Sequence, residues 1–246
     1  SEALATCYAM AENVFAVSQG GIDGPVVVDT VDADRLETSR RAEPAIPASR
    51  RVLEMVSAGQ PLPNCQIRVV GDDGRALGER EVGELALQSN CMLSGYYHRP
   101  DATREALRDG WFLTGDLGYL AGGQVYITGR KKDLIIVGGK NIYPQDVEYL
   151  INKVSGVYPG RVVVFGIPNP QLGTEDIAAV VEVDPHAPTP GDQLQLRIRQ
   201  AVATGMEATL THVLLVNERS LIKTSSGKLS RKANRDKFLA DMQGGE

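Results

Sequence analysis

Residues 126–141, "YITGRKKDLIIVGGKN", mark the point at which the pattern of the sequence changes. Upstream of "GRKKD" at 129–133, short segments of alternating apolar residues, separated by turn residues, predict the strands of a small sheet or barrel. Downstream, strand and helix patterns alternate over about 110 residues, which is the size of a compact α+β domain. The sequence therefore predicts two domains, residues 1–131 and 132–246, with a β-rich subdomain at 52–130 in the first.

The first domain carries several local signals. "QIRVV" at 66–70 and "VGELALQS" at 82–89 alternate apolar and polar residues on either side of "GDDG", which predicts a β-hairpin. "GQVYITG" at 123–129 predicts another strand, and "DATREALRDG" at 101–110 predicts a short helix capped by Asp101. Residues 29–51 are charged and have little periodicity, so we expect a surface excursion there.

The second domain shows clearer periodicity. A helix is predicted to begin at Pro144, because Val147, Leu150, Ile151 and Val154 form an apolar stripe of helical spacing. A second helix is predicted at 191–205. The apolar runs "RVVVFGI" at 161–167, "IAAVVEV" at 177–183 and "HVLLVN" at 212–217 predict strands.

Composition excludes several classes of protein. The chain has 246 residues, of which 42% are apolar and 23% charged, which is typical of a protein with a folded core. The net charge of −5 argues against nucleic-acid binding, and no apolar run approaches the ~20 residues of a membrane span. Three scattered cysteines argue against a disulfide framework and against a zinc site, so we expect a reducing, cytoplasmic location.

Several polar residues suit the binding of a nucleotide. Asp116, in a predicted Thr-Gly-Asp turn, offers two oxygens to a diol such as ribose, and Arg130 offers a planar fork to phosphate or ribose oxygens. Glu12 could hold Mg²⁺ through one carboxylate oxygen. Lys228, in "SSGK", could bind a phosphate oxygen. Each of these residues alone also fits an ordinary role: turn aspartate, exposed cation, helix-start acid or solvated loop lysine.

Taken together, these residues lie in motifs whose order resembles the C-terminal half of the acyl-adenylate-forming superfamily, which includes acyl-CoA synthetases, adenylation domains and luciferases. The resemblance extends over nearly the whole chain. It implies the end of a large α/β domain with a β-barrel-like subdomain, followed by a mobile α+β lid domain. The motifs are "YAMAEN" (8–13), "GELALQSNCMLSGYYHRPDAT" (83–103), "GWFLTGDLGYL" (110–120), "GRKKDLIIVGGKNIYPQDVE" (129–148) and "KTSSGKLSR" (223–231).

The resemblance assigns roles to individual residues. It implies that Asp116 binds the ribose hydroxyls, that Arg130 lies near ribose and phosphate, and that Glu12 is associated with Mg²⁺. The remaining nucleotide contacts that it implies come from Tyr8, which packs on adenine, and from Met10, Ala11 and Ile127.

In the second domain, Lys228 is expected to bridge the reacting carboxylate and the α-phosphate of ATP. Lys132 is the expected hinge. Gly138 and Gly139 are expected beside the tunnel for phosphopantetheine, whose thiol accepts the acyl group.

Two details favour the fatty acyl-AMP ligase branch, whose members pass acyl groups to an acyl carrier protein. "NIYPQDVE" at 141–148 resembles the phrase found there in that branch, and the usual "LPxYxVP" is missing before the final strand. The alternatives are an acyl-CoA synthetase that uses CoA, an amino-acid adenylation domain and a non-catalytic nucleotide-binding or carrier-docking fragment. Ala11 replaces a threonine that would contact phosphate, and alanine has no hydroxyl to make that contact.

The family's pyrophosphate loop and most of its acyl pocket should lie upstream of Tyr8. We therefore expect the N-terminal half of the same enzyme as a partner, either on a longer chain or on a separate one.

Overall fold

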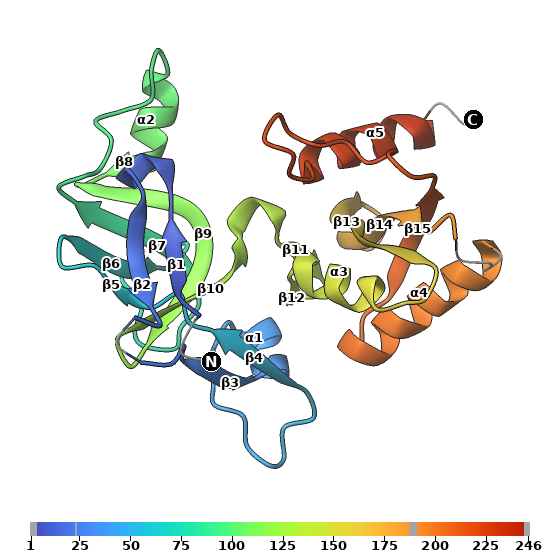
Figure 1. Ribbon diagram of the computed structural model, residues 1–246, viewed down its shortest axis with the longest axis horizontal. Coiled ribbons are helices and arrows are strands. Elements are labelled where there is room, and N and C mark those ends of the chain that lie inside the picture. The colour runs from blue at the N-terminus through green and yellow to red at the C-terminus, as the bar shows by residue number, and fades with distance from the viewer. Residues whose placement is uncertain (1–3, 23, 187–190, 244–246) are drawn as a thin grey trace. The chain divides into compact units, whose positions relative to one another are not determined.

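The chain folds into two compact units. The computed structural model describes residues 4–22, 24–186 and 191–243. Contacts group the chain into a first unit, Ser1–Lys132, and a second unit, Asp133–Glu246 (Figure 1). This division lies one residue beyond the predicted boundary, and the outermost residues of both predicted domains lie outside the described ranges. The identity of the two units, as the end of a large domain and a lid, stays a prediction.

The first unit is built around an antiparallel sheet of five strands. The strand order is β10-β9-β7-β6, with β8 paired to β9, and Figure 1 shows β9 strongly bent across the sheet. This half-barrel confirms the predicted barrel-like subdomain and the predicted hairpin. Its strands are β6 (Cys65–Val70), β7 (Gly83–Ser89), β8 (Leu107–Arg108), β9 (Trp111–Ala121) and β10 (Gln124–Arg130).

A second, three-stranded sheet precedes it, with the order β1-β2-β5. Apolar side chains of both sheets form one cluster, which includes Tyr8, Val17, Leu85, Leu87 and Val125. The elements are β1 (Thr6–Ala9), the short 3₁₀ helix η1 (Ala11–Asn13), β2 (Ala16–Gly20) and β5 (Gln60–Pro61).

Residues 29–51 are a surface excursion only in part: residues 45–50 form an exposed or half-buried loop, whereas residues 29–39 form a strand and a helix. They form most of a small unit in which β3 (Val28–Asp32) leads into α1 (Ala33–Ser39) and pairs with β4 (Val52–Val56). Val31 and Leu36 are buried, and the buried Glu37 carboxylate binds the Arg51 guanidinium at 2.7 Å. An internal ion pair therefore accounts for some of the charge that suggested a solvated loop.

The predicted short helix is also shifted. α2 (Pro100–Ala106) begins one residue before Asp101, with Arg99 as its N-cap residue and proline in its first turn. Proline suits this position because the first helical N–H groups have no partner within the helix.

The second unit has a three-stranded sheet between layers of helices. β13 (Val157–Asn169) pairs antiparallel with β14 (Thr174–Val183), and β15 (Leu210–Val216) joins β14 in parallel after the helix α4 (Gly191–Met206). The hairpin of β11 (Ile135–Val137) and β12 (Lys140–Ile142) precedes α3 (Pro144–Asn152), and α5 (Arg231–Gln243) ends the described part. The predicted helix start at Pro144 is confirmed.

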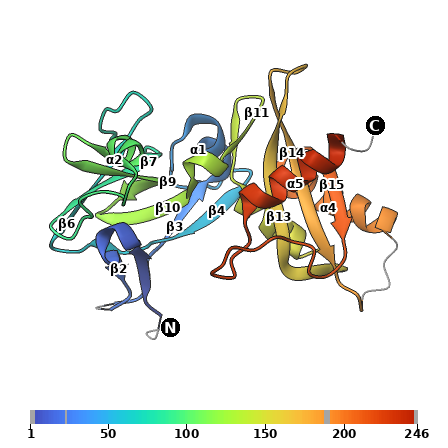
Figure 2. The ribbon, with the colours of Figure 1, turned by 90° about the horizontal axis from the view of Figure 1, so that it is seen from above.

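Both faces of this sheet are buried, which explains its continuous apolar strands. Val162 and Val164 point into a core shared with α3 and α4, while Val163 and Phe165 point into a core shared with Phe238 of α5. This alternation follows from the two-residue period of a strand. Figure 2 shows α5 lying over the sheet.

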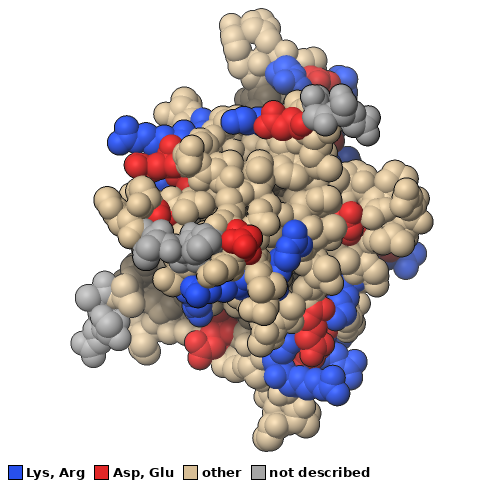
Figure 3. All heavy atoms as spheres, turned by 90° about the vertical axis from the view of Figure 1, so that its right-hand side faces the viewer, with Lys and Arg blue, Asp and Glu red and all other residues tan. Residues whose placement is uncertain are grey.

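The fold as a whole is mixed, as predicted, with α/β and α+β parts. Among the described residues, no helix is both long and apolar enough to cross a membrane. On the face drawn in Figure 3, Lys and Arg side chains lie among Asp and Glu side chains.

Candidate nucleotide and phosphate sites

Asp116 is positioned by a bulge rather than by the predicted turn. Leu117 lies opposite Glu84 in β7, but Leu113 lies opposite Ala86, so residues 114–116 bulge out of β9. Gly115 permits this with a φ of +71°. The Thr114 hydroxyl accepts the Asp116 N–H at 3.0 Å and donates to the Leu85 carbonyl at 2.9 Å, which closes the bulge.

The Asp116 carboxylate has two partners within the first unit. The Tyr8 hydroxyl donates to its Oδ2 at 2.6 Å, and Arg130 Nε lies 3.2 Å from its Oδ1. Asp116 and Arg130 are directly opposite each other in the β9–β10 pair. The carboxylate side chain is 13% exposed, whereas the Arg130 side chain is 61% exposed. The guanidinium is therefore held at one end and presented to solvent.

The tyrosine of this constellation is held in its neutral form. Burial raises the pKa of the Tyr8 hydroxyl, and the nearby Asp116 charge and hydrogen bond raise that pKa further. A neutral hydroxyl remains a hydrogen-bond donor, so Tyr8 orients the Asp116 carboxylate. The Tyr8 ring packs in the shared apolar cluster, against which Met10 and Ile127 also pack while remaining partly exposed.

These residues fit a ribose and a phosphate chemically. A carboxylate can accept hydrogen bonds from two neighbouring hydroxyls, and an exposed guanidinium suits phosphate oxygens. The set thus combines one oriented acceptor with one accessible cation.

Glu12 lies on η1, immediately after the exposed Ala11. The Tyr96 hydroxyl donates to Glu12 Oε1 at 3.2 Å. Across the described residues, no group of three or more His, Cys, Asp or Glu side chains could hold a metal ion. Glu12 therefore fits Mg²⁺ only as one carboxylate that acts jointly with phosphate oxygens, which is a common arrangement for that ion.

Lys132 lies at the end of the first unit, and its neighbour Lys131 is anchored there. Lys131 Nζ lies 3.0 Å from Glu84 Oε2 and 3.4 Å from Asp72 Oδ1. Lys132 itself is exposed. The chain is thus fixed to the first unit up to Lys131, which suits a hinge at the next residue.

In the second unit, Lys228 lies in an ordered turn between β15 and α5. The Thr224 N–H donates to the Lys228 carbonyl at 2.7 Å, and the Gly227 N–H donates to the Thr224 carbonyl at 2.9 Å. Gly227 has a φ of +83°. The Lys228 residue is exposed. Hydrogen bonds within the turn therefore satisfy part of its backbone, and Lys228 is exposed to solvent.

Gly138 and Gly139 form the turn of the β11–β12 hairpin in the same unit. Their φ values of +55° and +82° match a two-residue turn that requires positive φ at both positions. An open groove of about 640 Å³ lies beside them and is lined by Ile136, Gly138, Gly139, Leu172, Gly173, Thr174 and Glu175.

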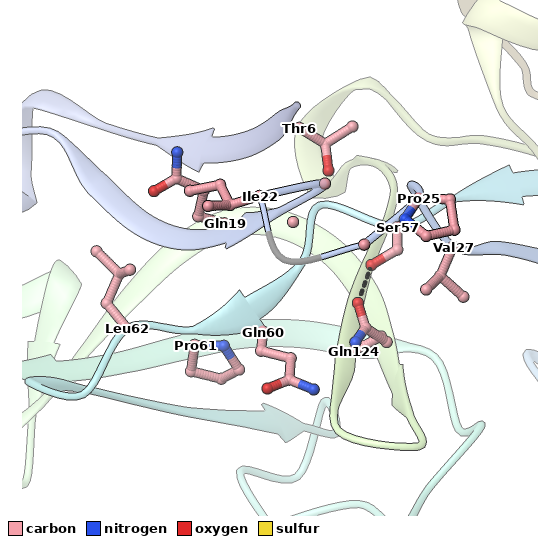
Figure 4. Close-up of a pocket in the computed structure, with 13 residues that line it drawn as sticks. Thr6, Gln19, Ile22, Pro25, Val27, Ser57, Gln60, Pro61, Leu62 and Gln124 are labelled. Atoms are coloured by element: carbon pink, nitrogen blue, oxygen red, sulfur yellow. Dashed lines mark hydrogen bonds between the residues drawn. The ribbon is translucent and has the colours of Figure 1, made fainter. Parts of the chain in front are cut away.

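A further cavity of about 350 Å³ lies in the first unit, away from Asp116 (Figure 4). The described residues around it carry no ionisable side chain, and Ser57 donates to Gln124 Oε1 at 2.7 Å there. Such a lining cannot neutralise a phosphate. The lining residues are Thr6, Gln19, Gly20, Gly21, Ile22, Gly24, Pro25, Val27, Ser57, Gln60, Pro61, Leu62 and Gln124.

The structure therefore joins Tyr8, Asp116 and Arg130 directly, whereas Glu12 is linked to Tyr96. Sequence reasoning missed Thr114 and Tyr96. Thr114 lies two residues before Asp116 in "LTGD", which was a usable signal, whereas Tyr96 is 84 residues from Glu12 and has no acidic neighbour in "GYYHRP". Lys228, Gly138 and Gly139 belong to the second unit.

Comparison with known proteins gives similarity along almost the whole chain. No family model matches. The "Putative acyl-CoA synthetase" of Caulobacter vibrioides (strain NA1000 / CB15N) is 36% identical over 253 residues, covering 99% of this chain and 42% of that protein. The "Fatty acid--[acyl-carrier-protein] ligase ScoC" of Streptomyces coeruleorubidus is 34% identical over 188 residues, covering 76% of this chain and 35% of that protein.

The fold is similar as well. A solved chain from structural and functional studies of fatty acyl-adenylate ligases from E. coli and L. pneumophila aligns with a TM-score of 0.88 at 31% identity. That alignment covers 99% of this chain and 43% of the solved one. The chain spans well under half the length of each of these three proteins.

Proposed function

The chain belongs to the acyl-adenylate-forming ligase superfamily, and from this premise we propose that the protein carrying it activates a carboxylic acid as acyl-AMP. We propose a fatty acid as the substrate and the phosphopantetheine thiol of an acyl carrier protein as the acyl acceptor. The observation that carries the proposal is the Tyr8–Asp116–Arg130 constellation, in which a buried tyrosine and an exposed arginine orient one carboxylate.

In this proposal the first unit binds the nucleoside. Asp116 accepts hydrogen bonds from the ribose hydroxyls, and Arg130 directs its exposed guanidinium to ribose and phosphate oxygens. Ile127 and Met10 offer partly exposed apolar surface to the base, beside Tyr8. Glu12 would hold Mg²⁺ together with phosphate oxygens, and that ion would supply positive charge to the phosphates.

Lys228 serves the adenylation step. A carboxylate oxygen of the acid attacks the α-phosphorus of ATP, the bond to the bridging oxygen breaks, and pyrophosphate leaves. Negative charge is concentrated on the phosphoryl oxygens, so a positioned ammonium stabilises the transition state without covalent chemistry. The exposed lysine on its closed turn suits this role.

The second step transfers the acyl group. The thiol sulfur attacks the acyl carbonyl carbon and gives its proton to solvent. The bond from that carbon to the phosphate oxygen breaks, so that AMP leaves and the acyl group stays on sulfur. Gly138 and Gly139 present a hairpin turn without side chains beside an open groove, which suits the close approach of a slim pantetheine arm.

Relatives point to two acceptors. The relative ScoC is named as a ligase that uses acyl carrier protein, and the similar solved chain comes from studies of fatty acyl-adenylate ligases. The Caulobacter relative is named as an acyl-CoA synthetase, which makes CoA the second candidate.

The test is pyrophosphate release by the full-length protein against fatty acids of increasing chain length, aryl acids and amino acids. CoA and a holo carrier protein then compete for the acyl group, and both products are followed by mass spectrometry. We expect release with fatty acids and transfer to the carrier. Transfer to CoA alone would favour the second candidate. If none of the acids causes pyrophosphate release, the result would instead favour a non-catalytic binding fragment.

A further inference from the structure

The Lys228 turn has a defined base. Ile222 and Ser230 face each other there, with the Ser230 N–H donating to the Ile222 carbonyl at 2.9 Å. Nearer the tip, Lys223 pairs with Leu229 in an isolated bridge. The position of Lys228 therefore depends on how firmly residues 222 and 230 are held.

Asn234, on α5, holds both ends of this base. Its Oδ1 accepts the Ile222 N–H at 2.9 Å, and its Nδ2 donates to the Ile222 carbonyl at 2.9 Å and to the Ser230 carbonyl at 2.7 Å. The Asn234 residue is 3% exposed. One side-chain amide thus pairs with residue 222 as a neighbouring strand would, and it also binds the other arm of the turn.

The chemistry of this position requires an amide. Only a side chain with an acceptor and two N–H donors can make all three bonds. The orientation of the amide is fixed, because a flipped amide would place its NH₂ group against the Ile222 N–H, and two donors cannot bond to each other. Leucine has similar bulk and makes none of these bonds. Aspartate keeps the acceptor and places a second oxygen against two carbonyls.

The neighbouring contact strengthens the arrangement. The buried Glu182 on β14 accepts the Leu221 N–H at 2.9 Å through its Oε1. The chain entering the turn is thereby tied to the sheet one residue before Asn234 takes hold of it. The turn is held at its base, while Lys228 stays exposed.

We infer that Asn234 is a positioning residue, whose amide holds the Lys228 turn in the shape that adenylation requires. The inference rests on the function proposed for Lys228. A catalytic ammonium on a loose turn would spend most of its time misplaced, and small misplacements reduce rates strongly.

The first arm of the test uses this chain and measures the order of the turn. Trypsin cleavage after Lys223 and Lys228 is followed by mass spectrometry, well below the unfolding temperature. Asn234→Leu should speed cleavage at both lysines by about 10-fold or more, because three bonds that close the base are lost. The control, Val202→Ala, creates a cavity in the core shared with α3 and α4 and should change these cleavage rates by no more than about twofold. Cleavage of Asn234→Leu at the wild-type rate would overturn the inference.

The second arm uses the full-length protein. Asn234→Leu should lower kcat for acyl-AMP formation by about 10-fold, with an unchanged KM for ATP and an unchanged rate of acyl transfer from synthetic acyl-AMP. If Lys228→Ala abolishes adenylation but Asn234→Leu does not slow it, the inference is wrong while the proposed function stands. If Lys228→Ala leaves adenylation intact, the role proposed for Lys228 fails first, and the inference fails with it.

Discussion

The Tyr8 hydroxyl and the Asp116 carboxylate are 108 residues apart in sequence and 2.6 Å apart in space. This bond ties β1 to the bulge of β9, and Arg130 completes the set from β10. A buried hydroxyl bonded to a carboxylate fixes the rotamer of the carboxylate before any ligand arrives. The acceptor that we assign to ribose is thus oriented by the fold itself.

This bond predicts a specific response to alkali. Burial raises the pKa of Tyr8, so folding favours the neutral hydroxyl. The neutral Tyr8 hydroxyl contributes fully to the free energy of unfolding below the ordinary tyrosine pKa of about 10. This contribution is lost as the pH rises above that value, by up to about 1.4 kcal/mol per pH unit. Tyr8→Phe lacks this group and should lose stability less steeply above pH ~10 in urea titrations.

The control for this experiment is Tyr97→Phe, because the Tyr97 residue is 88% exposed. That variant should keep the wild-type slope. The buried Tyr119 is unchanged in both variants, and burial also raises its pKa, so its contribution to the slope cancels. Equal slopes for wild type and Tyr8→Phe would show that the hydroxyl is not held as described.

Asp116→Ala in the full-length protein should raise the KM for ATP. A hydrogen bond from a diol to a charged acceptor is worth ~1.5–3 kcal/mol, which corresponds to roughly 10- to 150-fold. Steady-state pyrophosphate release over a range of ATP concentrations measures this value.

The first unit offers a chemically matched control for Asp116. Asp29 accepts the Tyr119 hydroxyl at 2.8 Å and lies 3.0 Å from Arg80, so it has the same three residue types. Asp29→Ala should cost stability and leave the KM for ATP unchanged. An Asp116→Ala enzyme with wild-type ATP dependence would make Asp116 a bulge residue with no role in nucleotide binding.

Much of the fold could be predicted because its strands carry strong local patterns. "RVVVFGI" is apolar on both faces of β13, since α3 and α4 cover one face and α5 the other. The strand and helix at 29–39 could not be predicted, because burial there depends on few apolar side chains and on the Arg51–Glu37 pair. No local period reveals an ion pair that forms only after folding.

The site could be predicted only in part. Asp116 and Arg130 flank one hairpin, and adjacent antiparallel strands bring such residues opposite each other. The Tyr8–Asp116 bond joins distant segments, so residue types could suggest it but not establish it. The bulge at Gly115 could not be predicted without the register between β7 and β9. The role of Asn234 leaves no local pattern in the sequence, because its partners are main-chain atoms.

Lys228→Ala should affect one half-reaction. Pyrophosphate exchange should fall by roughly 10²–10³, because the ammonium stabilises charge that develops during adenylation. ATP binding should change little, and acyl transfer from synthetic acyl-AMP should survive. Lys223→Ala removes an exposed cation from the other arm of the same turn and serves as the control. Equal losses in both half-reactions, or loss in neither, would contradict the assignment.

Gly138→Asn should impair acyl transfer and leave adenylation intact, which is the opposite of the effect expected for Lys228→Ala. Gly138 has a φ of +55°, and an added Cβ would meet no atom within 4 Å, so asparagine can occupy the turn at little cost to stability. Its side chain would nevertheless stand beside the groove proposed for pantetheine. We expect acyl transfer to a holo carrier protein to fall by roughly 10-fold, while pyrophosphate exchange and the unfolding temperature stay near wild type.

Gly160→Asn is the matched control. Gly160 has a φ of +72°, and an added Cβ there would also meet no atom within 4 Å, but Gly160 does not line the groove. That variant should transfer acyl groups at the wild-type rate. If Gly138→Asn does so too, the two glycines serve only the geometry of the β11–β12 turn, and the thiol must reach the acyl-AMP by another route.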